Sequence, residues 1–293
     1  MLPIFYINLA SRPDRREFMD DQLRALGLVG TRIEAVTPAD ISAEEANLYC
    51  NGENPNYLRK NELACTRSHE LCWQTMLDMG AERALVFEDD VKISARLPEL
   101  LNALDTIDAE LIRIDALGST IRVYPVDQTT ARGIAIRRFR STTAGSAGYI
   151  INRSAARKFL GHPQLRERAF DLVLYDPFEK PGSDVSRVLT EPALCQQVGS
   201  YHDKTAHIGK SNITPDGVQH VYPQRHPIRY WIKRLRTGAK RGFRNAVDHF
   251  AEKRNGLERR WILLDSEMNE AFSKTLGNSA PSDNPVASTS EVK

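Results

Sequence analysis

Short apolar runs alternate with helix-periodic segments along the first 160 residues. Residues 4–9 form a continuous apolar run that predicts a buried strand. Residues 11–26 follow with apolar positions three and four apart, and Gly27 is typical of a helix end. Ser11 and Asp14 have the spacing of a capping box at the start of that helix. This alternation predicts a layered α/β fold.

The same patterns predict further elements along the chain. Strands are expected at 32–36, 84–87, 111–114, 134–139 and 149–152, and helices at 62–79 and 154–160. Ser154 is the expected N-cap of the last of these helices. Residues 37–60 are polar and rich in turn residues, which predicts a mobile loop.

The pattern changes near Pro227. We expect a domain over residues 1–226, a basic amphipathic helical extension over 227–274, and a disordered tail over 275–293, where Ser, Pro, Asn and Ala dominate. Within residues 228–262, eleven basic and three acidic residues give a charge of +8. Since the whole chain carries +2, the remainder carries −6.

Composition narrows the class of protein. The 293 residues are 41% hydrophobic and 27% charged, which is ordinary for a soluble globular protein and excludes global disorder. No window approaches the ~18 apolar residues of a membrane span, and the apolar N-terminus is too short for a secretory signal. The four cysteines lack C-x-x-C spacing and are expected to be mostly buried thiols. A cytoplasmic location follows as an expectation.

Three adjacent acids, Glu88, Asp89 and Asp90, directly follow the apolar strand expected at 84–87. Adjacent carboxylates repel one another, and a hard divalent cation with oxygen ligands relieves that repulsion. The carboxyl end of a strand in an α/β sheet is also where ligands usually bind. A solvated acidic turn is the alternative.

The first strand and helix carry a second group of polar residues. Asn8 ends the strand, and Arg12, Arg15 and Arg16 lie at the start of the helix. Guanidinium groups beside a helix N-terminus favour a phosphate or diphosphate, although Asp14 could equally neutralise them. Neither the dinucleotide fingerprint G-x-G-x-x-G nor a P-loop occurs.

Other candidates have weaker signals. Ser68 and His69 lie in the helix expected at 62–79, where a lone histidine is more often structural than catalytic. Asp171 precedes an apolar run and could be an N-cap or a general base. The segment Gly145–Gly148 could approach a ligand through its backbone or form a bend.

Taken together in this order, these stretches resemble glycosyltransferase family 25, which includes bacterial lipopolysaccharide and lipooligosaccharide sugar transferases. The matching stretches are FYINLASRPDRREFM, ELACTRSHELCWQTML, ALVFEDDV, GSAGYIINRSAARKFL, and AFDLVLYDP followed by EPALCQQ. They cover most of residues 4–198. The resemblance implies a GT-A-like single α/β domain with a mostly parallel sheet, a nucleotide-sugar donor, a glycan or glycolipid acceptor, and a divalent cation, Mn²⁺ or Mg²⁺.

The resemblance also implies roles for individual residues. Glu88 and Asp90 would face the metal and the donor, Asp89 would be oriented away from them or toward the acceptor as a catalytic candidate, and Asp171 would be the base. The donor-binding candidates are Asn8, Arg12, Arg15, Ser68, His69 and Glu88. Family members are regarded as inverting, so a single displacement at the anomeric carbon of a hexose is expected.

The basic segment supports a competing hypothesis. Its apolar residues fall on one helix face, and basic amphipathic helices with Trp are typical of membrane-surface anchors. Packing of that face on the domain and binding of nucleic acid are alternatives. A non-catalytic membrane- or nucleic-acid-binding protein is therefore the second hypothesis. The acid cluster argues against it, and we expect peripheral contact with an anionic membrane but no nucleic acid.

Overall fold

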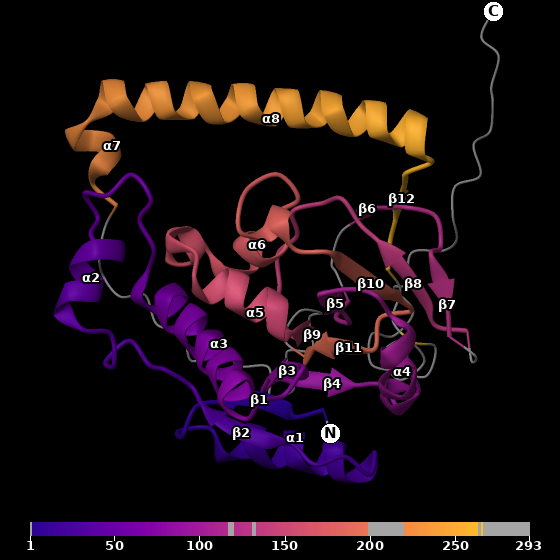
Figure 1. Cartoon of the computed structure of the whole chain (residues 1–293). Coiled ribbons are helices and arrows are strands. Elements are labelled where there is room, and N and C mark those ends of the chain that lie inside the picture. The colour runs from indigo at the N-terminus through magenta and orange to yellow at the C-terminus, as the bar shows by residue number, and fades with distance from the viewer. Residues whose placement is uncertain (1, 117–119, 131–132, 199–219, 263–264, 266–293) are drawn as a thin grey trace, which may run out of the picture.

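The computed structural model describes residues 2–116, 120–130, 133–198, 220–262 and 265. Its centre is an eight-stranded sheet with the strand order β2-β1-β3-β9-β5-β10-β8-β7 (Figure 1). Its strands are β1 (Ile4–Asn8), β2 (Thr31–Glu34), β3 (Arg83–Glu88), β5 (Leu111–Arg113), β7 (Gln128–Thr129), β8 (Ala135–Arg138), β9 (Gly148–Asn152) and β10 (Arg187–Glu191). Two small antiparallel sheets pair β4 (Val91–Ile93) with β11 (Cys195–Gln197), and β6 (Ile121–Val123) with β12 (Glu258–Arg260).

Most strands of the large sheet run in one direction. β1 is parallel to β2 and to β3, and β10 is parallel to β5. β9 is antiparallel to both β3 and β5, so those two strands also run alike. The predicted α/β class with a largely parallel central sheet is confirmed. The carboxyl ends of β1, β3 and β5 consequently meet at one edge, where ligands of α/β sheets usually bind.

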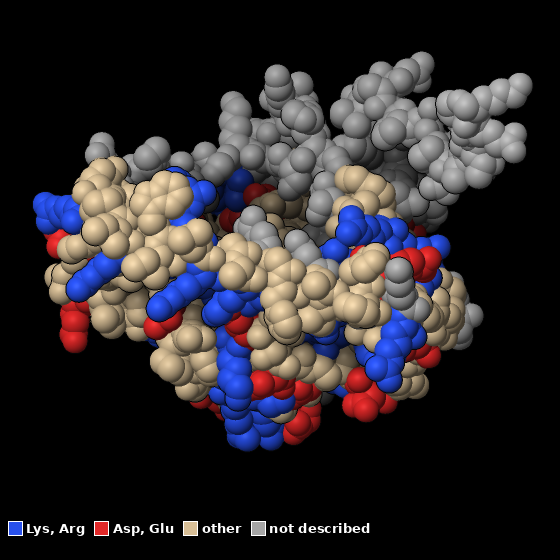
Figure 2. Space-filling view, turned by 90° about the horizontal axis from the view of Figure 1, so that it is seen from above, with Lys and Arg blue, Asp and Glu red and all other residues tan. Residues whose placement is uncertain are grey.

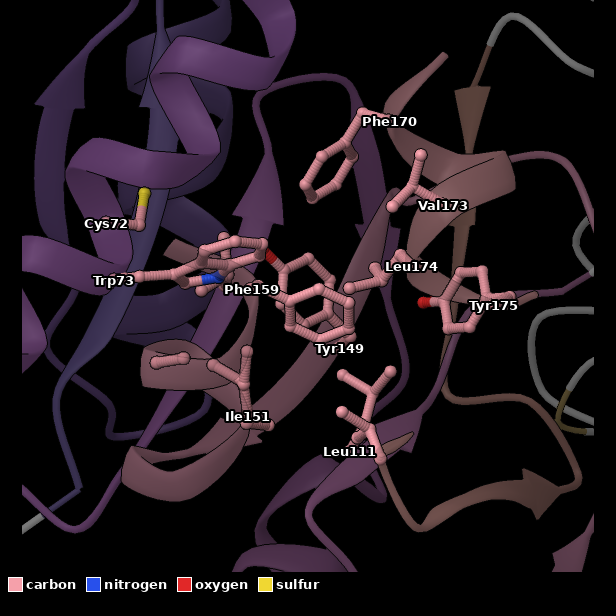
Figure 3. Packing of buried hydrophobic residues seen from close by; sticks show 14 of the residues in the cluster. Cys72, Trp73, Leu111, Tyr149, Ile151, Phe159, Phe170, Val173, Leu174 and Tyr175 are labelled. Carbon is pink, nitrogen blue, oxygen red and sulfur yellow. The ribbon is translucent and has the colours of Figure 1, made fainter. Parts of the chain in front are cut away.

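Helices cover both faces of the sheet. Successive side chains of a strand point to opposite faces, so each strand contributes to a buried cluster on either side. Phe5 and Ile7 belong to a buried cluster with Trp73, whereas Ile4 and Tyr6 belong to another. The helices contributing to these faces are α3 (Lys60–Asp78), α5 (Arg153–Leu160) and α6 (Phe170–Leu174) for the first cluster, and α1 (Pro13–Ala25) and α4 (Leu97–Ala103) for the second. Figure 3 shows aromatic rings from α3, α5, α6 and β9 filling the first cluster.

Several helix starts differ from the predictions. Arg12, not Ser11, is the N-cap of α1, and no side chain caps it. Asn152 caps α5 in place of Ser154, since its side chain accepts a hydrogen bond from the backbone of Ala155 at 2.8 Å. Both predicted caps lie one to two residues from the real boundary, a usual uncertainty of cap assignment.

The polar segment 37–60 is not entirely a loop. It contains helix α2 (Ala43–Tyr49), whose N-cap Ser42 accepts a hydrogen bond from the backbone of Glu45. Ser42 and Glu45 have the Ser-x-x-Glu spacing of a capping box, which indicates a helix start despite the polar surroundings. The short 3₁₀ helices are η1 (Leu104–Thr106), η2 (Pro163–Arg166) and η3 (Gly182–Asp184).

The C-terminal part begins with α7 (Tyr222–Arg225) and the 29-residue helix α8 (Pro227–Asn255), which crosses one side of the molecule (Figure 1). The start of α8 coincides with the predicted boundary at 226/227. The helix ends earlier than predicted, because Gly256 adopts a left-handed conformation with φ +64. The chain then returns to the body as β12. The predicted tail, 275–293, lies outside the described residues, and no helix in the described part is both long and apolar enough to cross a membrane.

Salt bridges and hydrogen bonds join α8 to the body at both ends. Near its start, Lys233 donates to the side chain of Asn56 at 2.8 Å. Near its end, the buried carboxylate of Asp248 lies 2.8 Å from Arg140 and 3.3 Å from Arg122. Large apolar side chains on α8 are exposed by 44–75%: Ile228, Trp231, Ile232, Leu235, Phe243 and Phe250. The structure thus does not show the predicted alternative in which the apolar face packs on the body.

Candidate active site

The acid cluster lies where the topology predicts, at the carboxyl edge of the sheet. Glu88 is the last residue of β3, and Asp89 and Asp90 form the turn that leads into β4. Asn8 ends the neighbouring strand β1, which pairs with β3 so that Ile7 lies opposite Glu88. Two strand ends therefore bring the opening motif and the acid cluster together.

Asp89 joins the acid cluster to the opening motif. Its carboxylate accepts hydrogen bonds from the Asn8 amide and from the Arg15 guanidinium, each at 2.7 Å. Asn8 is buried, and its amide oxygen in turn accepts from Arg32 at 2.9 Å. Arg12 lies in the same region and forms a 2.7 Å ion pair with Asp14, which lowers the pKa of that carboxyl to about 2. Asp14 is thus the acidic neighbour that the sequence offered as the alternative to a bound anion. Asp89 mainly fixes the position of Arg15.

Glu88 and Asp90 are the carboxylates with capacity for a further ligand. Burial and the nearby Asp90 raise the pKa of Glu88 to about 8. Glu88 accepts hydrogen bonds from Ser146 at 3.0 Å and from Gln197 at 2.9 Å. One Asp90 oxygen lies 3.2 Å from Arg15, whereas its Oδ1 is buried without a hydrogen-bond partner among the described residues. Burial also raises the pKa of Asp90 despite the opposing charge of Arg15.

This arrangement fits a divalent cation that is shared with a phosphate group. No group of three or more His, Cys, Asp or Glu side chains within the described ranges is placed to hold a metal. Mg²⁺ and similar ions are, however, commonly held by one or two carboxylates together with substrate phosphates. Two mutually destabilised carboxylates and the buried Oδ1 of Asp90 meet that requirement.

Asp171 enters the site from α6. It lies in the first turn of that helix, not at the N-cap, which is Ala169. Its Oδ2 accepts a hydrogen bond from the backbone N–H of Gly145 at 2.7 Å, and its Oδ1 accepts from Leu172 N–H at 2.8 Å. Since Gly145 precedes Ser146, which binds Glu88, a single loop connects the candidate base to the acid cluster.

Ser68 and His69 are buried within the protein. The Ser68 hydroxyl accepts from the backbone of Val36 and donates to Ala64 O, both at 2.9 Å. His69 lies 2.9 Å from the Tyr149 hydroxyl, stacks on Phe170 at a centroid distance of 4.1 Å, and is completely buried. Burial lowers the pKa of His69 to about 3. These contacts give both side chains a structural role, and their contact with a donor stays a prediction.

The sequence reasoning missed several residues of this region. Cys65, expected to be buried, is exposed. Asp115 follows β5 as the acid cluster follows β3, and that pattern could have identified it. Gln197 and Ser146 carry no sequence signal of their own. They reach Glu88 through β11 and through the loop before β9.

Comparisons with known proteins show the family of this chain. The model of glycosyltransferase family 25 (LPS biosynthesis protein) matches residues 1–173. Lacto-N-neotetraose biosynthesis glycosyltransferase LgtE of Neisseria gonorrhoeae is 30% identical over 204 residues, which cover 65% of this chain and 72% of that protein. Inactive glycosyltransferase 25 family member 3 of Homo sapiens is 29% identical over 174 residues, which cover 56% of this chain and 29% of that protein.

A solved structure of mannose-1-phosphate geranyltransferase from Thermus thermophilus overlaps with a TM-score of 0.38 and 13% identity, over 68% of this chain and 76% of that chain. This overlap is too loose to support any argument about function. The family match, which spans more than half of the chain, is decisive. The chain is a glycosyltransferase with an α/β fold, and it belongs to glycosyltransferase family 25.

Proposed function

We propose that this glycosyltransferase moves a hexose from a nucleotide-sugar donor to a saccharide acceptor of a lipopolysaccharide or related cell-surface glycan, with inversion and with a divalent cation. One observation carries the proposal: the partly buried Glu88 and the buried Asp90, which lies 3.2 Å from Arg15, are carboxylates of raised pKa at the carboxyl edge of the sheet. Family membership and the name of LgtE support the substrate class.

The donor diphosphate would lie between the first helix and the acid cluster. Arg15 and Arg12 supply positive charge there, and Asp89 keeps Arg15 in place. A cation held by Glu88 and Asp90 would neutralise charge on the leaving nucleoside diphosphate. The side chains of this region thereby orient the donor and favour departure of its diphosphate.

Asp171 would remove the proton from the attacking hydroxyl of the acceptor. A sugar hydroxyl is a poor nucleophile at neutral pH, and a positioned carboxylate base typically contributes ~10²–10⁴-fold in rate. The two backbone N–H groups bonded to Asp171 fix the plane of its carboxylate. In an inverting displacement, one such base on the acceptor side is sufficient.

We also propose that α8 rests on an anionic membrane surface, where a lipid-linked acceptor would be found. Its large apolar side chains point to solvent, and Figure 2 shows uncharged surface along α8 with Lys and Arg side chains beside it. Exposed apolar groups next to cationic ones are typical of interfacial helices. A nucleic-acid interface would instead expose the cationic groups and bury the apolar ones.

Thermal unfolding with a panel of nucleotide sugars, each with and without Mn²⁺, tests the donor and metal together. Ligands that bind only the folded state raise the melting temperature. We expect a shift that requires both components, and its loss in Asp90→Asn. Asp127→Asn is the matched control, since Asp127 is a carboxylate that pairs with Arg138 of β8. No shift with any donor would favour the non-catalytic alternative.

A further inference from the structure

A buried ion pair lies directly beneath the candidate site. Arg113, the last residue of β5, is 1% exposed, and its Nε lies 2.7 Å from Asp115 Oδ1. The guanidinium group also lies over the Tyr175 ring at 4.2 Å (Figure 3 shows the ring). Burying such a pair costs desolvation energy that its mutual attraction often only offsets. A contribution to stability therefore does not by itself explain why this ion pair is buried at this position.

Arg113 and Asp115 hold the segment of residues 143–147, called here the 143–147 loop. Arg113 donates hydrogen bonds to the Thr143 hydroxyl and, at 2.9 Å, to the Ala144 carbonyl. Asp115 accepts a backbone hydrogen bond from Ala147, which helps to oppose the rise in its pKa to about 6 that burial causes. The ion pair thus contacts the loop on both sides of Gly145.

Gly145 fits closely against this pair. It has φ +88, a conformation that other residues rarely adopt. A Cβ atom at this position would lie 3.2 Å from Arg113 Nη2 and 3.5 Å from Asp115 Oδ2. A side chain at this position would therefore require both a strained backbone and a small shift of the Arg113 guanidinium group.

The opposite side of the loop holds the two candidate functional carboxylates. Gly145 N–H donates to Asp171 Oδ2 at 2.7 Å, and the Ser146 hydroxyl donates to Glu88 Oε1 at 3.0 Å. The contacts run without interruption from the ion pair, through the loop, to Glu88 on β3 and Asp171 on α6.

We infer that Arg113 and Asp115 are positioning residues, which set the 143–147 loop so that Asp171 and Glu88 are held in fixed relation to each other. The inference rests on the proposed function, because it assigns Asp171 to the acceptor and Glu88 to the donor. Catalytic groups require placement within about 0.5 Å, and a 1 Å displacement can cost about 10²-fold in rate. The ion pair touches neither substrate.

Arg113→Lys tests this assignment, because lysine keeps the positive charge opposite Asp115 but lacks the planar fork that reaches two loop positions. We expect kcat for sugar transfer to fall about 10–100-fold, with the dissociation constant of the donor changed by less than about threefold, since a factor of three is under 1 kcal/mol. Gly145→Ala reaches the loop by a separate route and should give the same split. Arg137→Lys is the matched control. Arg137 on β8 is also buried, and it pairs with Glu191 on β10.

Amide hydrogen exchange supplies a readout that does not depend on activity. Arg113→Lys should speed exchange over residues 143–147 and at Leu172, whereas Arg137→Lys should not. A folded Arg113→Lys variant with normal kcat, or with unchanged exchange in the loop, would overturn the inference. If the unmodified protein transfers no sugar, the proposed function fails, and the exchange data alone still decide whether the pair positions the loop.

Discussion

The exposed face of α8 leads to a quantitative prediction about membrane binding. Phe243 and Phe250 lie two helical turns apart on one face and are 72% and 74% exposed. Burying a phenylalanine side chain fully contributes about 1.5–3 kcal/mol. At this exposure, each ring has about 1.5 kcal/mol to gain from entering the interface. Replacing either with serine should therefore weaken binding about tenfold.

The assay is co-sedimentation with phosphatidylcholine vesicles prepared with and without phosphatidylglycerol. Basic residues near an anionic surface add about 1 kcal/mol each, so binding should require the anionic lipid and weaken as salt is added. The Phe243→Ser, Phe250→Ser double variant should bind about 100-fold less tightly, because two such losses add.

Val29→Ser is the control, since Val29 is 86% exposed on the connection between α1 and β2, on the side away from α8 (Figure 1). It should leave vesicle binding unchanged. Binding of the double variant with the affinity of the unmodified protein would refute the assignment of α8 to the membrane. An equal loss in Val29→Ser would show that the effect is not specific to this helix.

Two further predictions concern Asp171 and His69. Asp171→Asn should reduce kcat by about 10²–10⁴-fold while donor-induced thermal stabilisation persists; an unchanged kcat would reassign the base. His69 has a pKa of about 3 when folded against about 6.5 when unfolded, so below pH 6.5 the unfolded chain takes up a proton that the native state refuses. The free energy of unfolding should therefore decrease as the pH is lowered, and this residue should account for about 1.5 kcal/mol of the loss between pH 6.5 and pH 5. Urea unfolding of His69→Phe should show a correspondingly smaller loss, and an identical pH dependence would contradict the burial of this residue.

Elements with strong local patterns could be predicted from the sequence. Strands β1 and β3 were found from their continuous apolar runs, and the long helix α3 was found from its helical period. Strand β10 and the short strands β4, β6, β7, β11 and β12 were not predicted. Those five strands have three residues or fewer, too few for a measurable period, whereas the equally short β5 was predicted because Ile114 extends its apolar run. Their positions depend on pairing with strands far away in the sequence, such as β12 with β6.

The candidate site shows the same division. Glu88, Asp90 and Asn8 could be placed together because each lies at or just after the end of a strand, and strand ends of a parallel sheet share an edge. The bond from Gly145 to Asp171 spans 26 residues, and the bond from Gln197 to Glu88 spans 109. No local pattern encodes such contacts. His69 was a site candidate from its motif, but its burial against Phe170 depends on the packing of α3 on α6.

Sugar transfer by Asp90→Asn tests the central claim most directly. The substitution keeps the shape of the side chain but removes the charge that, with Glu88, is proposed to hold the cation. Loss of that charge also relieves the repulsion that raises the pKa of Glu88, so the fold should be retained or stabilised. We expect an unchanged or higher melting temperature, with transfer reduced at least about 10²-fold. A folded Asp90→Asn variant with near-normal turnover would contradict the proposed role of Asp90.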